Sequence, residues 1–180
     1  MDYKLYSAVV MLATLSFSTA AAVTADASLG KLINERLSWM KDVAGAKAQQ
    51  HQAIEDLAQE QKVLARAVID AESLGLDGES VKPFIQAQMD AAKAIQYRYR
   101  ADWLSTPETS WQPRPLNEVR KQISELSDRI LRKVAERLKA SGKLTEADRE
   151  EFMRTVQQHN LTEQDKAHMW QAIKLVSLKA

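Results

Sequence analysis

Apolar residues recur at helical spacing along almost the whole chain after residue 28, and no segment shows the sustained alternation of a β-strand. The pattern predicts helices over residues 29–50, 56–74, 79–104 and 117–141. Breaks between them are expected at the glycine pair around residues 75–78, in the proline-containing segment 105–115 and at Gly142. The cap-like sequences starting at Thr145 and Thr162 predict two more helices. The chain is therefore predicted to be all-α, a single-domain bundle of about six helices.

The first 27 residues do not fit this bundle. A short charged start ends at Lys4, an apolar run follows over residues 5–17, and small residues lead to the A-x-A sequence that ends at Ala27. This order is typical of a secretory signal peptide. We predict a signal at residues 1–27, cleaved after Ala27, and a helical domain at 28–180. Cleavage after Ala22 and an uncleaved anchor are the alternatives. The mature protein is expected to be periplasmic or secreted, without membrane association.

Composition and charge narrow the range of possible partners and cofactors. The formal net charge of +1 does not favour nucleic acid as a partner. The chain has no cysteine, and its three histidines (His51, His159 and His168) show no metal-ligand spacing. We therefore expect no metal.

Several polar residues interrupt the apolar stripes of the predicted helices. At about 100° per residue, Arg36 and Lys47 share one face of the first helix with Met40 and Val43. The other polar residues that are predicted to face inward are Asp56, Glu60, Gln96 and Arg120.

Each of these residues also has an ordinary structural explanation. Long cations usually extend to water, and a lone buried glutamine is often a satisfied structural amide. Asp56 is placed to cap the second long helix, with Gln59 reaching back to it, and Glu60 suits the first turn of that helix. Taken together, however, three inward cations and two acids leave positive charge to be satisfied. A small polyanionic ligand inside the bundle would satisfy it.

Four stretches give the chain a resemblance to a known family. They are NERLSWMKDVAGAK at 34–47, IED at 54–56 with Glu60 following, AAKAIQYRYRADW at 91–103 and LNEVRKQISELSDRIL at 116–131. The chain resembles the all-helical (type II) chorismate mutases, in particular their exported subclass. The resemblance implies the substrate chorismate, the product prephenate, no cofactor and a homodimer with its site inside one subunit.

The resemblance also implies roles for individual residues. Arg36 and Arg120 match arginines that bind substrate carboxylates, and Lys47 matches a lysine that reaches a carboxylate and the ether oxygen. Gln96 matches the residue that hydrogen-bonds the ether oxygen. Asp56 and Glu60 match acids near the ring hydroxyl. The chain departs from the family at Gln59, where an arginine is usual, and at Ala46, Ala48 and Ala53, where larger or more rigid residues are usual.

Three other functions remain open at this point. A mutase-derived binding protein would hold a small dianion without converting it. A lyase acting on an isomer of chorismate would release pyruvate. An exported helical interaction module would have purely structural inward charges.

Overall fold

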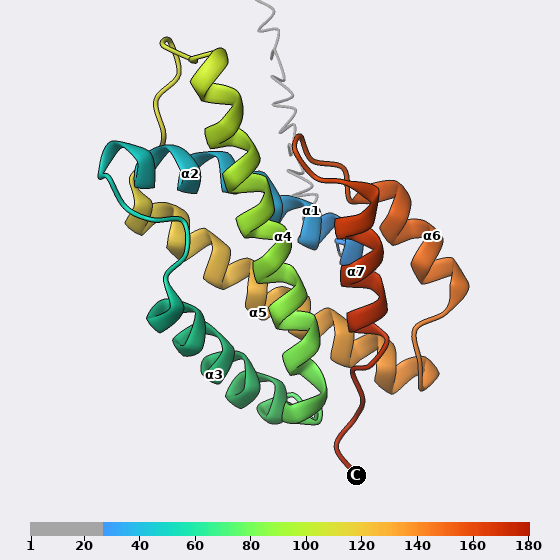
Figure 1. Cartoon of the computed structure of the whole chain (residues 1–180). Coiled ribbons are helices and arrows are strands. Elements are labelled where there is room, and N and C mark those ends of the chain that lie inside the picture. Colours follow the sequence, from blue (N-terminus) through green and yellow to red (C-terminus); the bar gives the residue numbers. More distant parts are fainter. Residues whose placement is uncertain (1–26) are drawn as a thin grey trace, which may run out of the picture.

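The computed structural model describes residues 27–180, so the predicted signal peptide lies outside the described residues apart from Ala27. Within that range the chain forms seven helices. Figure 1 shows them as one bundle crossed by the long helices α4 and α5. Their bounds are α1 Leu29–Ser38, α2 Met40–Gln49, α3 Leu57–Ser73, α4 Gly78–Ser105, α5 Leu116–Ser141, α6 Glu146–Thr155 and α7 Glu163–Ile173. The predicted all-α fold class is confirmed.

The capping sequences place the helix ends. Thr145 and Thr162 each start a helix with a complete capping box, in which the threonine hydroxyl accepts from the backbone N–H three residues on and an aspartate accepts in return. Gly142 ends α5 in the left-handed region at φ 72°, where a side chain would be strained. These ends match the predicted breaks.

The first predicted helix is instead two helices, separated by Trp39. This residue has ψ −7°, away from regular helix, while the apolar pattern continues on both sides of it. The Trp39 ring stacks against the Arg114 guanidinium at 4.6 Å, and Asp42 accepts a hydrogen bond from the Arg114 backbone N–H at 2.8 Å. The break therefore coincides with the place where the loop after α4 packs onto α1 and α2.

That loop, residues 106–115, is held by aromatic contacts. Trp111 lies against α2 at Gly45, where a Cβ atom would come within 2.7 Å of the indole ring. Lys41 lies 4.6 Å from the centroid of the same ring and pairs with Glu108 at 2.5 Å. Glycine at position 45 thus permits the close approach that fixes the loop on α2.

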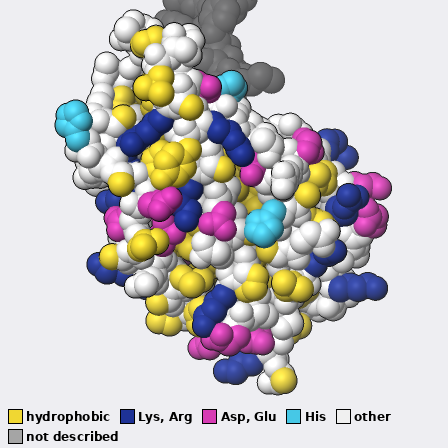
Figure 2. All heavy atoms as spheres, in the orientation of Figure 1, with side chains coloured by type: hydrophobic (Ala, Val, Ile, Leu, Met, Phe, Trp, Pro, Cys, Tyr) yellow, Lys and Arg dark blue, Asp and Glu magenta, His cyan; other side chains and the backbone are white. Residues whose placement is uncertain are grey.

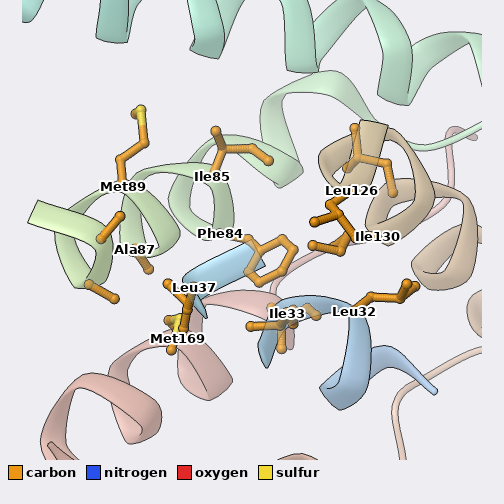
Figure 3. Packing of buried hydrophobic residues seen from close by; sticks show 14 of the residues in the cluster. Leu32, Ile33, Leu37, Phe84, Ile85, Ala87, Met89, Leu126, Ile130 and Met169 are labelled. Atoms are coloured by element: carbon orange, nitrogen blue, oxygen red, sulfur yellow. The ribbon is translucent and has the colours of Figure 1, made fainter. Parts of the chain in front are cut away.

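The apolar core lies where α1, α4, α5 and α7 meet. Phe84 of α4 is fully buried and points toward Ile33 and Leu37 of α1, with Ile130 of α5 and Met169 of α7 beside them (Figure 3). Helices α6 and α7 complete this side of the bundle by packing on α1 and α4. The opposite side, between α3 and the pair α4 and α5, carries the polar cavity described below.

The surface carries both signs of charge. Figure 2 shows lysine and arginine side chains interspersed with acidic ones over the visible face, rather than one large patch of a single sign. Among residues 27–180, no helix is both long enough and apolar enough to cross a membrane.

Candidate active site

A cavity of about 370 Å³ lies between α1, α2, α3, α4 and α5. This volume falls within the range of small-molecule sites. All seven residues singled out from the sequence line it: Arg36, Lys47, Asp56, Gln59, Glu60, Gln96 and Arg120. They come from five helices and from the N-cap of α3, so the fold brings together side chains that are up to 84 positions apart.

Arg36 is a buried cation that has no acidic partner at hydrogen-bonding distance among residues 27–180. Its side chain is 6% exposed, its Nε donates to Ser127 Oγ at 3.2 Å, and one terminal nitrogen is buried with no hydrogen-bond partner among the described residues. Burial lowers the pKa of Arg36 to about 10. A buried cation with an unused donor is costly, and an anion in the cavity would offset that cost.

Lys47 is the second buried cation. Its Nζ donates to the carbonyl of Ile54 at 2.5 Å, which ties α2 to the linker before α3 and leaves two more N–H donors. Burial lowers the pKa of Lys47, and the positive charge of Arg120 lowers it further, while Asp56 opposes the shift. The ammonium group therefore lies in a field that favours the arrival of negative charge.

Gln96 presents a neutral amide to the same cavity. It is 5% exposed, and its Nε2 donates to the carbonyl of Ala92 at 3.0 Å. The same Nε2 also donates to Met40 Sδ, a weak acceptor, at 3.6 Å. Its Oε1 is buried with no hydrogen-bond partner among the described residues. One N–H donor is thus held only weakly and is available to a ligand oxygen.

The acidic wall is built at the start of α3. Asp56 caps the helix by accepting from the backbone N–H of Gln59 at 3.1 Å. It borders the cavity but is exposed, so the prediction that it faces inward was wrong. The prediction that the Gln59 side chain reaches back was wrong: Glu60 does so, its Oε1 accepting from the Asp56 N–H at 3.4 Å. Glu60 Oε2 in turn accepts from Lys93 Nζ at 2.9 Å. The exposed Gln59 side chain is left facing the cavity.

Arg120 lies at the mouth of the cavity and is exposed, so the prediction that it faces the core was wrong. In the first turns of α5 the buried side chains are Leu116 and Val119, while Arg120 borders both the cavity and a groove beside the linker before α3. Arg120 lies at the edge of this buried face, and Ile123, one turn farther along the predicted stripe, is only half-buried. Arg120 can meet a ligand as it enters without the desolvation that Arg36 has undergone.

Positive charge exceeds negative charge around the cavity. Its lining includes six lysines or arginines and four aspartates or glutamates, an excess that suits a dianion. The sequence interpretation missed several polar lining residues. They are Lys62, Arg66, Gln88, Lys93, Ser124, Ser127, Asp70 and Asp128.

Gln88 is the missed residue with the clearest sequence signal. It is eight positions before Gln96 on α4, about 80° away around the helix, so the two amides share one broad helical face. Like Gln96 it is buried, at 4% exposed, and its Oε1 lacks a hydrogen-bond partner among the described residues. An unpaired buried amide oxygen in a cavity wall marks a place where a ligand donor would be accepted.

Comparison with known proteins shows the family. Residues 20–97 match the family model described as "Chorismate mutase type II". A relative from Yersinia pestis, described as "Secreted chorismate mutase", is 56% identical over 148 residues, which cover 82% of this chain and 80% of the relative. The chain belongs to the type II chorismate mutase family. Every candidate residue except Arg120 lies inside the segment that the family model matches.

Further similarities cover more than four fifths of the chain. A "Monofunctional chorismate mutase" from Enterobacter agglomerans is 42% identical over 149 residues, covering 83% of this chain and 82% of the relative. The crystal structure of the secreted chorismate mutase from Yersinia pestis superposes with a TM-score of 0.79 at 54% identity, covering 84% of this chain and 97% of that one. A chorismate mutase structure from Burkholderia phymatum, 20% identical with a TM-score of 0.66, shares the fold.

Proposed function

We propose that the protein is a chorismate mutase that converts chorismate to prephenate in the cavity between α1 and α5. The observation that carries the proposal is the pair of buried cations, Arg36 and Lys47, with donors that no acid of the cavity occupies. Chorismate brings two carboxylates and an ether oxygen, which are acceptors only. Family membership and the names of the relatives support the same reaction.

The reaction depends more on how the substrate is positioned than on reactive side chains of the protein. Chorismate rearranges in one concerted step, so no nucleophile and no proton transfer are required. Arg36 inside the cavity and Arg120 at its mouth bind the two carboxylates and hold the side chain over the ring. Fixing that reactive pose removes much of the entropic barrier.

Lys47 and Gln96 act on the bond that breaks. Negative charge grows on the ether oxygen in the transition state, and donors already fixed in a partly dry cavity stabilise it without reorganisation. The Lys47 ammonium is held by the Ile54 carbonyl, and the Gln96 amide by the Ala92 carbonyl. Asp56 and Glu60 face the ring hydroxyl, and Gln59 completes this wall.

We also propose that residues 1–27 form a signal peptide cleaved after Ala27. The domain at 28–180 would then act in the periplasm or outside the cell. The order of charged, apolar and small residues supports export, as does the description of the Yersinia pestis relative as secreted. N-terminal sequencing of protein recovered from the periplasm tests the cleavage. A new N-terminus at Ser28 is expected, and an intact Met1 would contradict it.

The resemblance further supports a homodimer with one complete site per subunit. Light scattering on the purified protein is expected to give twice the mass of one chain. The mass of a single chain would contradict it.

Product identification tests the function itself. Purified protein is incubated with chorismate, and the products are separated and identified by NMR. Prephenate is expected as the sole product. Release of pyruvate in a parallel incubation with the isomer of chorismate would instead indicate a lyase. Saturable binding of a bicyclic dicarboxylate transition-state analogue without turnover would indicate a binding protein. If the protein showed neither turnover nor binding, it would be an interaction module whose inward charges are structural.

A further inference from the structure

Lys93 of α4 lines the cavity, although neither the sequence pattern nor the family resemblance singles it out. Its side chain is 22% exposed, and its Nζ lies 2.9 Å from Glu60 Oε2 on α3. A second, longer contact of 3.4 Å joins it to Asp90 on its own helix. The hydrogen bond that Lys93 donates to Glu60 raises the pKa of Lys93, so the lysine stays charged.

The ion pair between Lys93 and Glu60 fixes the orientation of the Glu60 carboxylate. With Oε2 held by Lys93, the remaining oxygen, Oε1, has only a long 3.4 Å contact from the Asp56 backbone N–H. Because a carboxylate oxygen has two lone pairs, Oε1 retains capacity to accept from a ligand hydroxyl. Without Lys93 the carboxylate, whose side chain is 19% exposed, would lack its cation.

A lone carboxylate in this place would oppose the proposed substrate. Chorismate is a dianion, and charges of like sign in a partly buried cavity repel strongly. Gln59, the residue that precedes Glu60, is neutral and cannot offset the carboxylate. Lys62 also lines the cavity, but its side chain is exposed. Lys93 therefore supplies the nearest fixed positive charge.

We propose that Lys93 is a positioning residue that holds Glu60 for the substrate hydroxyl and cancels its charge against the substrate carboxylates. The proposal rests on the proposed chorismate mutase function. It assigns Lys93 the electrostatic role that a charged residue at position 59 would otherwise share. The competing explanation is an ion pair that only joins α3 to α4.

The test compares Lys93→Met and Lys93→Arg with the unsubstituted protein, measuring kcat and KM for chorismate separately. Lys82→Met is the matched control, because Lys82 pairs with Glu79 three residues earlier on the same helix, away from the cavity. We expect Lys93→Met to raise KM at least tenfold with a smaller change in kcat, and Lys93→Arg to stay within threefold of the original values. A KM for Lys93→Met as close to the original as that of Lys82→Met would overturn the proposal.

A double substitution separates positioning from a structural link. Neutral glutamine at position 60 needs no cation, so adding Lys93→Met to Glu60→Gln should change KM less than twofold further. An ion pair that only joined the helices would make Lys93→Met lower the melting temperature where Glu60 is present, but hardly where Glu60 is already glutamine, and would leave KM unchanged in both backgrounds. A direct contact of Lys93 with substrate would give multiplicative losses. Either result overturns the proposal. If the unsubstituted protein does not convert chorismate, the proposed function fails and this inference fails with it.

Discussion

Replacing Arg36 with methionine should make the protein more stable while removing its activity. In the folded protein, burial lowers the pKa of Arg36 from 12.5 to about 10. At about 1.4 kcal/mol per pKa unit, keeping this guanidinium charged costs the folded state about 3 kcal/mol near neutral pH. The substitution removes that cost, and methionine is flexible enough to fill much of the space.

The substitution also removes one hydrogen bond. Ser127 Oγ loses the Arg36 Nε donor but keeps its own bond to the Ile123 carbonyl at 2.7 Å, so no donor is left unpaired. Losing a hydrogen bond to a charged group costs about 1.5–3 kcal/mol at most. The net expectation is a gain of no more than about 2 kcal/mol in the free energy of unfolding. For a domain of this size each kcal/mol raises the melting temperature by about 2–4 °C.

Urea unfolding and chorismate turnover, measured on the same preparation, test this reasoning. Arg132→Met is the matched control, because Arg132 lies exposed on α5 outside the cavity. Arg36→Met should show a higher urea midpoint than the unsubstituted protein and a kcat/KM lower by at least a hundredfold, while the control should change little in either. A clear loss of stability for Arg36→Met would refute the view that this cation is held at a cost for the sake of an anionic ligand.

Three further predictions concern the same cavity. Burial and the positive charge of Arg120 lower the pKa of Lys47, so kcat/KM should begin to fall at a pH below 10.5 as Lys47 loses its proton. Lys47→Arg should abolish that decline. A decline that persisted in Lys47→Arg would exclude Lys47 as the titrating group. Gln59→Arg should raise kcat/KM about tenfold or more, since a charge-assisted contact is worth about 1.5–3 kcal/mol; an unchanged or lower value would show that the wall has adapted to glutamine. Ser127→Ala should lower kcat/KM about tenfold, because it frees Arg36 Nε. Ser141→Ala is the control, since it loses a similar hydrogen bond to the carbonyl four residues earlier, and it should leave kcat/KM unchanged. Equal effects of the two substitutions would contradict a positioning role for Ser127.

Much of the fold could be predicted from the sequence because its helix ends carry strong local signals. Thr145 and Thr162 start capping boxes and Gly142 takes a left-handed conformation, and all three depend on residues close in the chain. The break at Trp39 could not be predicted in this way. It coincides with contacts to a loop more than 70 residues away, through Arg114 and Asp42, while the apolar pattern continues through it.

The candidate site was predictable where a charge interrupts an apolar stripe in the middle of a helix. Arg36 and Lys47 are buried as that argument requires. Arg120 is exposed because the buried face at the start of α5 is formed by Leu116 and Val119, and Arg120 lies at the edge of that face, which the apolar stripe alone does not show. Lys93 was missed because its partner, Glu60, is on another helix.

The most direct test of the account is kcat/KM for chorismate, measured for the unsubstituted protein beside Lys47→Ala and Lys41→Ala. Both lysines belong to α2, but Lys47 faces the cavity, whereas Lys41 pairs with Glu108 of the surface loop. We expect prephenate formation that Lys41→Ala largely retains and Lys47→Ala abolishes, with the helical circular dichroism of all three proteins unchanged. Turnover by Lys47→Ala at the original rate would contradict the claim that this cavity is the active site.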